Sequence, residues 1–182
     1  VPVRHWRRED LFDKTGLLWI NPSPNMRSLT EALLYPGIGL LETTNLSVGR
    51  GTDTPFEIVG APWIDARELA GALNACDLSG VRFVPRRFTP DASVYTDQLC
   101  EGINIMITDR ETFESVPTGF EIAYQLRRLY PDDWSAERYD RLLTSSVTLD
   151  ALLEGRTSEE MLGLGHEEME SFLHRREQYL MY

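Results

Sequence analysis

The sequence predicts an α+β fold in which a small mixed or antiparallel sheet packs with helices and the last third of the chain is helical. Three observations predict it. Isoleucines alternate with polar or smaller residues over 103–107, which is typical of a half-buried strand. Apolar residues recur at helical spacing after Pro117. From Pro131 onward only helical patterns occur, and mixed elements followed by helices alone favour the α+β class.

The first predicted elements are a helix, a strand and a long polar loop. Ser28-Leu29-Thr30-Glu31 has the pattern of a capping box, so we expect a helix that runs to about Tyr35. Pro36-Gly37 should end this helix, because both residues disfavour helix interiors. The apolar run that follows is interpreted as a buried strand over 38–42, and the polar residues 43–57 as a loop.

A second helix and a second strand follow the loop. Asp65-Ala66-Arg67-Glu68 repeats the capping pattern and begins an amphipathic helix that ends near Cys76. A strand is expected over 81–88, at a sheet edge or with a bulge, because Pro85 lacks an N–H to donate. Later helices are expected from Pro117 to Pro131, over 149–153 with Thr148 as the cap, and around Met169, Phe172 and Leu173.

Composition excludes several classes of function. The chain has 182 residues and a formal net charge of −11, which argues against nucleic acid and anionic membrane surfaces as partners. No apolar run is long enough to cross a bilayer, so no membrane insertion is expected. Cys76 and Cys100 are the only cysteines, and the sequence leaves open whether they pair or remain two buried thiols. No cysteine or histidine spacing suits a metal and no nucleotide fingerprint occurs, so we expect neither metal nor cofactor.

The most informative stretch is the polar segment from Glu42 to Thr52. It holds a carboxylate, an amide, several hydroxyls and an arginine between two glycines. Polar groups this dense after a buried strand are typical of a loop that faces a cleft. Gly49 and Gly51 should let backbone N–H groups approach a ligand and leave the Arg50 guanidinium free to swing. The alternative is a solvated loop whose Ser and Thr side chains cap turns.

Each candidate residue has a structural alternative. Glu42 follows a buried run that would raise its pKa towards that of a catalytic acid, or it forms a structural ion pair with Arg50. Trp63 is placed to stack on a sugar face, or it is a core residue. Asn25 follows prolines that would aim its amide at a ligand, or it is a turn residue.

Several motifs resemble, in order, those of the exo-β-N-acetylmuramidase family (the NamZ type, long catalogued as a domain of unknown function). They cover almost the whole chain, and those within residues 21–65 are highly specific. The motifs are Asn21-Pro22-Ser23-Pro24-Asn25-Met26, Tyr35-Pro36-Gly37, the run from Leu41 to Thr52, Pro55-Phe56-Glu57, Gly60-Ala61-Pro62-Trp63-Ile64-Asp65, Val81-Arg82-Phe83, Phe88-Thr89-Pro90, Cys100-Glu101-Gly102, Thr108-Asp109-Arg110 and Tyr179-Leu180-Met181-Tyr182.

The resemblance implies part of an enzyme that removes N-acetylmuramic acid from the non-reducing end of peptidoglycan fragments. Members of the family have an N-terminal Rossmann-like domain and a C-terminal α/β domain, with the active site in the cleft between them. Residues 1–182 resemble the C-terminal domain alone, so the N-terminal domain, the expected source of a catalytic glutamate, is the implied partner. Members are often exported, which favours a secreted or periplasmic protein.

The resemblance also implies which residues line this domain's side of the cleft. Glu42 is the catalytic candidate, although the general acid is not assigned by the match. The implied substrate-binding residues are Asn25, Thr44, Asn45, Arg50, Gly51, Thr52 and Trp63.

A lactyl carboxylate distinguishes muramic acid from glucosamine. An arginine can bind such a group through two charge-assisted hydrogen bonds, so the sharpest hypothesis is that Arg50 recognises it. Two other functions stay open: a non-catalytic module that binds carbohydrate or peptidoglycan, and a structural interaction domain.

Overall fold

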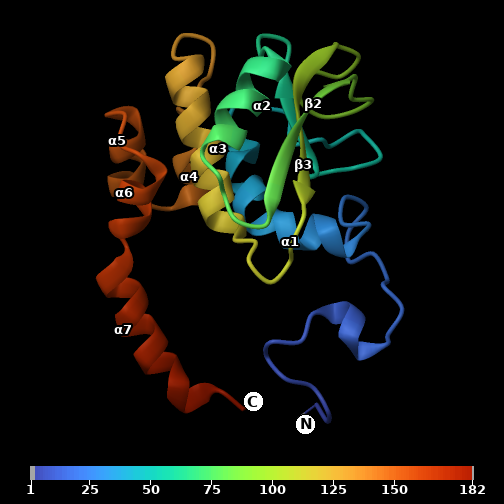
Figure 1. The fold of residues 1–182 in the computed structure, drawn as a ribbon, viewed down its shortest axis with the longest axis vertical. Helices are drawn as coiled ribbons and strands as arrows, with labels where there is room; N and C mark the ends of the chain where they lie inside the picture. The colour runs from blue at the N-terminus through green and yellow to red at the C-terminus, as the bar shows by residue number, and fades with distance from the viewer. Residues whose placement is uncertain (1–2, 182) are drawn as a thin grey trace.

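The structure is built on a three-stranded antiparallel sheet with a layer of helices beside it (Figure 1). The computed structural model describes residues 3–181. Strand β3 is central and pairs with β1 on one side and β2 on the other. This arrangement confirms the predicted α+β class and resolves the sheet as antiparallel. The strands are β1 (Ile58–Ala61), β2 (Val81–Phe88) and β3 (Cys100–Ile107).

The two outer strands differ in how well the sequence predicts them. Strand β2 is an edge strand, as Pro85 indicates, and Pro85 stands opposite Ile103 of β3. Strand β1 was not predicted. All four of its residues are buried, so it has no polar and apolar alternation to reveal it.

The predicted strand over 38–42 is wrong, because the first helix continues through it. Helix α1 runs from Leu29 to Ile38 and passes into a 3₁₀ turn, η2 (Gly39–Thr43). Leu34, Ile38 and Leu41 are fully buried and recur at helical spacing. The period of a short apolar run does not separate a buried strand from a buried helix, and here helical packing decides. The capping box at Ser28 is present as predicted.

Pro36 and Gly37 lie inside α1 and do not end it. A Cβ atom on Gly37 would lie 1.9 Å from the backbone oxygen of Ser115, at the start of helix α3 (Ser115–Leu129). Gly119 of α3 faces the same contact, since its Cβ would lie 2.5 Å from the oxygen of Gly37. The Ser115 hydroxyl donates to the Leu34 carbonyl and accepts from the Gly37 N–H, both at 2.9 Å. Glycine therefore serves here to bring two helices together.

Helix α2 (Ala66–Ala75) packs against strands β2 and β3 and against helix α3, and α3 also packs against α1. The Asp65 side chain caps α2 by accepting from two backbone N–H groups, as predicted. Cys76 and Cys100 are both free; Cys100 is buried and Cys76 is exposed, so the expectation of two buried thiols is right for one of them.

The helical last third is confirmed. Ser145, rather than the predicted Thr148, caps the helix at residues 146–153. Within residues 3–181 no helix is long and apolar enough to span a membrane. The helices are α4 (Asp140–Leu143), α5 (Ser146–Leu153), α6 (Ser158–Gly163) and α7 (His166–Arg176), followed by the 3₁₀ turn η3 (Glu177–Tyr179).

Two segments extend away from the core on the same side of the molecule (Figure 1). One is the N-terminal segment, which contains the 3₁₀ turn η1 (Phe12–Thr15), and the other is α7. Neither η1 nor α7 has a buried residue, so the predicted apolar residues of the last helix face solvent.

We predict that Gly37→Ala destabilises the fold by about 3 kcal/mol, because the added methyl group forces α1 and α3 apart. Gly71→Ala is the matched control, since Gly71 lies in α2 and a methyl group added there would have no atom within 4 Å. Alanine there should stabilise the fold by about 0.5–1 kcal/mol. Urea unfolding measures both changes. Equal effects of the two substitutions would contradict the close contact.

Candidate functional site

The polar segment from Glu42 to Thr52 packs closely against the loop at residues 91–92. Gly51 has φ +77°, and a Cβ atom there would lie 2.4 Å from the backbone nitrogen of Ala92. The Asp91 N–H donates to the Gly51 carbonyl at 2.8 Å. The close backbone approach expected at Gly51 is therefore made by the loop at residues 91–92.

Arg50 and Glu42 form the ion pair that the sequence left open as an alternative. The Arg50 guanidinium donates two hydrogen bonds to the Glu42 carboxylate, from Nε and, at 3.0 Å, from Nη2. It also stacks over Phe56, with Cζ 5.1 Å from the ring centroid. The two charged side chains are 27 % and 29 % exposed. The expectation of a freely swinging guanidinium is wrong, because these contacts fix it.

Thr44 and Asn45 use their polar side-chain atoms within the chain. The Thr44 hydroxyl donates to the Leu41 carbonyl at 2.8 Å and so completes the turn after α1. The Asn45 amide donates to the Asp133 carbonyl and accepts from the Ser135 N–H, both at 2.7 Å. Asn45 thereby ties the polar segment to the loop before α4.

Trp63 is half-buried and hydrogen-bonded. Its indole Nε1–H donates to the Tyr95 hydroxyl at 3.1 Å, and that hydroxyl donates to the Asn45 carbonyl at 2.8 Å. The Trp63 ring also packs against Tyr130, with centroids 5.4 Å apart. Both interpretations of Trp63, as a core residue and as a cleft wall, are compatible with this position.

A pocket of about 370 Å³ lies beside the polar segment and is called here the Arg27–Arg86 pocket. Larger hollows of about 520 and 820 Å³ lie against α5 and beside the N-terminal segment, but they include no predicted site residue. The lining of the Arg27–Arg86 pocket combines two arginines, two aspartates, three threonines, a glycine and two apolar side chains: Arg27, Gly51, Thr52, Asp53, Thr54, Ile58, Arg86, Phe88, Thr89 and Asp91.

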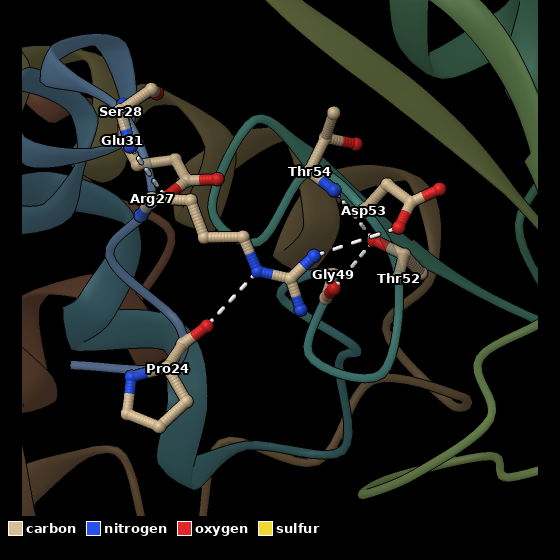
Figure 2. Close-up of polar contacts among 8 residues, drawn as sticks. All are labelled: Pro24, Arg27, Ser28, Glu31, Gly49, Thr52, Asp53 and Thr54. Atoms are coloured by element: carbon tan, nitrogen blue, oxygen red, sulfur yellow. Dashed lines mark hydrogen bonds and ion pairs between the residues drawn. The ribbon is translucent and has the colours of Figure 1, made fainter. Parts of the chain in front are cut away.

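Arg27 links the motif at residues 21–26 to the loop that follows the motif from Leu41 to Thr52 (Figure 2). Its Nε donates to the Pro24 carbonyl at 3.0 Å, and its Nη1 lies 3.5 Å from Asp53 Oδ1. In Figure 2 its side chain extends from the chain before α1 towards the loop at Thr52 and Asp53. Asn25 lies in the adjoining turn, where its N–H donates to the Ser23 hydroxyl at 3.3 Å.

The Thr52 hydroxyl stabilises the loop at residues 49–54 through two hydrogen bonds. Its Oγ1 donates to the Gly49 carbonyl at 2.6 Å and accepts from the Thr54 N–H at 3.3 Å (Figure 2). Gly51 and Thr52 are the two predicted substrate-binding residues that line the pocket. The other predicted site residues are not part of its lining: Asn25, Glu42, Thr44, Asn45, Arg50 and Trp63.

Arg86 is the cation of the pocket whose side chain lacks a partner within residues 3–181, and the Asp91 carboxylate there is also unpaired. It is exposed on the edge strand β2, and within residues 3–181 no hydrogen bond or ion pair engages its guanidinium. Sequence reasoning missed both Arg27 and Arg86. Only the position of Arg86 in an edge strand hinted at accessibility, and no spacing linked it to residues 49–54.

Glu57 is the carboxyl group near this site with a perturbed pKa. Partial burial raises its pKa above the ordinary value, and the nearby Glu31 carboxylate raises it further. A hydrogen bond from the Ser28 hydroxyl, at 3.3 Å, acts in the opposite direction. No group of three potential metal ligands occurs within residues 3–181.

Comparison with known proteins places this chain in a family. The profile described as exo-beta-N-acetylmuramidase NamZ, C-terminal, matches residues 33–182. The chain belongs to this family. The peptidoglycan beta-N-acetylmuramidase NamZ of Bacillus subtilis (strain 168) is 37 % identical over 185 residues, which cover 100 % of this chain and 45 % of that protein. The resemblance stated from the motifs is thereby confirmed.

Two solved structures share the fold of this NamZ C-terminal family member. A DUF1343 family protein from Bacteroides fragilis NCTC 9343 has a TM-score of 0.88 and 27 % identity, over 97 % of this chain and 48 % of that chain. A second one from the same organism has a TM-score of 0.66 and 24 % identity, over 89 % and 43 %. The chain thus spans less than half the length of each of these relatives.

We predict that Glu57→Gln raises the stability of the fold at pH 7. Because the folded-state pKa is raised, stability is lost as pH rises from about 4.5 through the folded pKa and a negative charge forms in a partly buried site. The neutral amide avoids that loss, and the gain should vanish near pH 4, where Glu57 is protonated. Urea unfolding at both pH values measures the difference, with exposed Glu137→Gln as the control. A gain that is the same at both pH values would contradict it.

Proposed function

We propose that this chain forms the substrate-cleft half of a glycoside hydrolase that removes N-acetylmuramic acid from the non-reducing end of peptidoglycan fragments. Membership of the NamZ C-terminal family supports the reaction class. The observation that carries the proposal for this chain is the Arg27–Arg86 pocket, which lies where residues 24–27, at the end of the first motif, meet residues 51–54, at the end of the motif from Leu41 to Thr52.

The lining of the pocket suits the parts of a muramic acid residue. The unpaired Arg86 guanidinium, with Arg27 beside it, is suited to the lactyl carboxylate, because arginine binds carboxylates through paired, charge-assisted hydrogen bonds. Asp53 and Asp91 can accept hydrogen bonds from sugar hydroxyls. Phe88 offers apolar surface to the methyl group of the N-acetyl substituent.

The fixed Arg50 changes the assignment expected from the sequence. Its guanidinium already binds the Glu42 carboxylate, so recognition of the lactyl group passes in this proposal to Arg86. Glu42 acts as a positioning residue that holds the loop carrying Gly51 and Thr52 against the pocket. The proton donor of the reaction then belongs to the N-terminal Rossmann-like domain, the proposed partner.

The alternative function is a non-catalytic module that binds carbohydrate or peptidoglycan. The ion pair of Glu42 favours the non-catalytic module, because the carboxylate of this catalytic candidate already binds the Arg50 guanidinium. Both functions use the same pocket, and they differ in whether a complete protein turns over a muramide.

We predict that Arg86→Ala weakens binding of N-acetylmuramic acid by about ten- to a hundredfold, since one charge-assisted hydrogen-bonding group is worth roughly 1.5–3 kcal/mol. Binding of N-acetylglucosamine, which lacks the carboxylate, should not change. Chemical-shift titration of the 182-residue chain with each sugar measures both affinities.

Arg82→Ala is the matched control for this experiment. Arg82 lies on the same exposed side of β2, since residues of even number share that side, but it does not line the pocket. It should bind both sugars like the unchanged chain. Equal losses for both sugars in Arg86→Ala, or no shifts at residues 51–54 and 86–91 in the unchanged chain, would contradict the assignment.

We predict that the 182-residue chain alone does not hydrolyse a chromogenic N-acetylmuramide and that a protein containing both halves does. The reason is that glycoside hydrolysis needs two carboxyl groups across the scissile bond, and this half leaves Glu42 engaged with Arg50. Release of the chromophore measures turnover. Turnover by the chain alone would contradict the assignment of the proton donor to the N-terminal domain. Binding without turnover by the two-part protein would favour the non-catalytic binding module.

A further inference from the structure

Helix α7 presents an apolar stripe that the described chain leaves largely exposed, with only the Arg176 guanidinium over the Phe172 ring, 5.9 Å from its centroid. Met169, Phe172 and Leu173 recur at the spacing of one helix face, and their exposed fractions are 56 %, 49 % and 37 %. No residue of α7 is buried. We call these three residues the α7 face.

The N-terminal segment carries a second uncovered apolar group. Leu17, Leu18 and Ile20 are 68 %, 83 % and 81 % exposed, and we call them the N-terminal apolar group. An ion pair of 2.7 Å between Asp13 and Arg110 ties the neighbouring turn to the loop after β3. The segment therefore has a defined position although its apolar side chains face solvent.

Exposed apolar surfaces of this kind are expected to be buried against another folded body. A helix of eleven residues is marginal in water by itself, so most of the stability of α7 must come from packing of its apolar stripe. Contiguous apolar surface on a soluble protein usually marks an interface. The α7 face and the N-terminal apolar group lie on segments that project from the same side of the core (Figure 1), so one body can cover both.

We propose that the other half of the same two-part protein docks on the α7 face and the N-terminal apolar group. This inference rests on the two-part organisation in the proposed function. The Bacteroides fragilis relative matches 97 % of this chain at a TM-score of 0.88, so that fold accommodates the two projecting segments, and this chain accounts for only 48 % of its length. The remaining half is a body of the required size.

A second copy of this chain is a poorer occupant. Parallel pairing through α7 would bring together the glutamates of its first turns, Glu167, Glu168 and Glu170, whereas antiparallel pairing would place them near the basic last turn of the other copy. Symmetric pairing through α7 in either direction would cover the α7 face alone. It would also leave the N-terminal apolar group uncovered. A domain of different sequence can match both surfaces at once.

Hydrogen–deuterium exchange tests the docking without any sugar present. The backbone amides of α7 and of residues 16–21 are compared between the 182-residue chain and the two-part protein encoded by the complete gene. We expect exchange to slow by about tenfold or more in the two-part protein, because docking removes local opening. Phe172→Glu in the two-part protein should restore fast exchange in both segments.

Val147→Glu is the matched control, since Val147 is a helical residue with 61 % exposure outside the two surfaces. It should leave the protection unchanged. Equal exchange rates in the two proteins, protection of the isolated chain that grows with its concentration, or a gene that encodes no further folded region would each overturn the proposal. The sugar titration of Arg86→Ala tests the proposed function, and hydrogen exchange without sugar tests the docking. Each result can fail without the other, so the two proposals are distinguishable.

Discussion

The ion pair between Glu42 and Arg50 is the interaction on which the site depends. It joins the turn after α1 to the loop that carries Gly51 and Thr52, and both charged side chains are about three-quarters buried. A bidentate pair in this setting is worth more than an exposed one, and loss of either partner would leave an uncompensated charge. The stacking of the guanidinium over Phe56 adds a further constraint. Thr52 and its neighbours consequently face the pocket from a fixed loop.

That pair in turn depends on the contact between α1 and α3. Gly37 and Gly119 let the two helix backbones meet, and the Ser115 hydroxyl bonds to backbone groups of α1 on either side of Pro36, which itself has no N–H to donate. Helix α1 can then continue to Ile38 and deliver Glu42 one 3₁₀ turn later. The polar segment is thus positioned by the packing of buried helices rather than by the end of a strand.

The elements that could be predicted from the sequence are those whose signals are local. The caps at Ser28 and Asp65 and the edge position of Pro85 each follow from one residue type in a short pattern. The buried strand β1 and the helical character of residues 38–41 could not be predicted, because a fully apolar run carries no period. The same limit applies to the site. Gly51 and Thr52 belong to a dense motif, but Arg27 and Arg86 are brought to one pocket only by the tertiary fold.

The two uncovered surfaces and the pocket have a common physical explanation in a two-part protein. An open pocket of about 370 Å³ lined by exposed arginines binds a sugar weakly, because water competes for every hydrogen bond. A second domain seated against α7 and the N-terminal segment would exclude that water, and strengthen the charge-assisted contacts, where it also extends over the pocket. Apolar surface placed on segments that project from the core can anchor such a domain without occupying the pocket. Separation of the docking surface from the sugar-binding surface then lets each half retain its own core while the cleft forms between them.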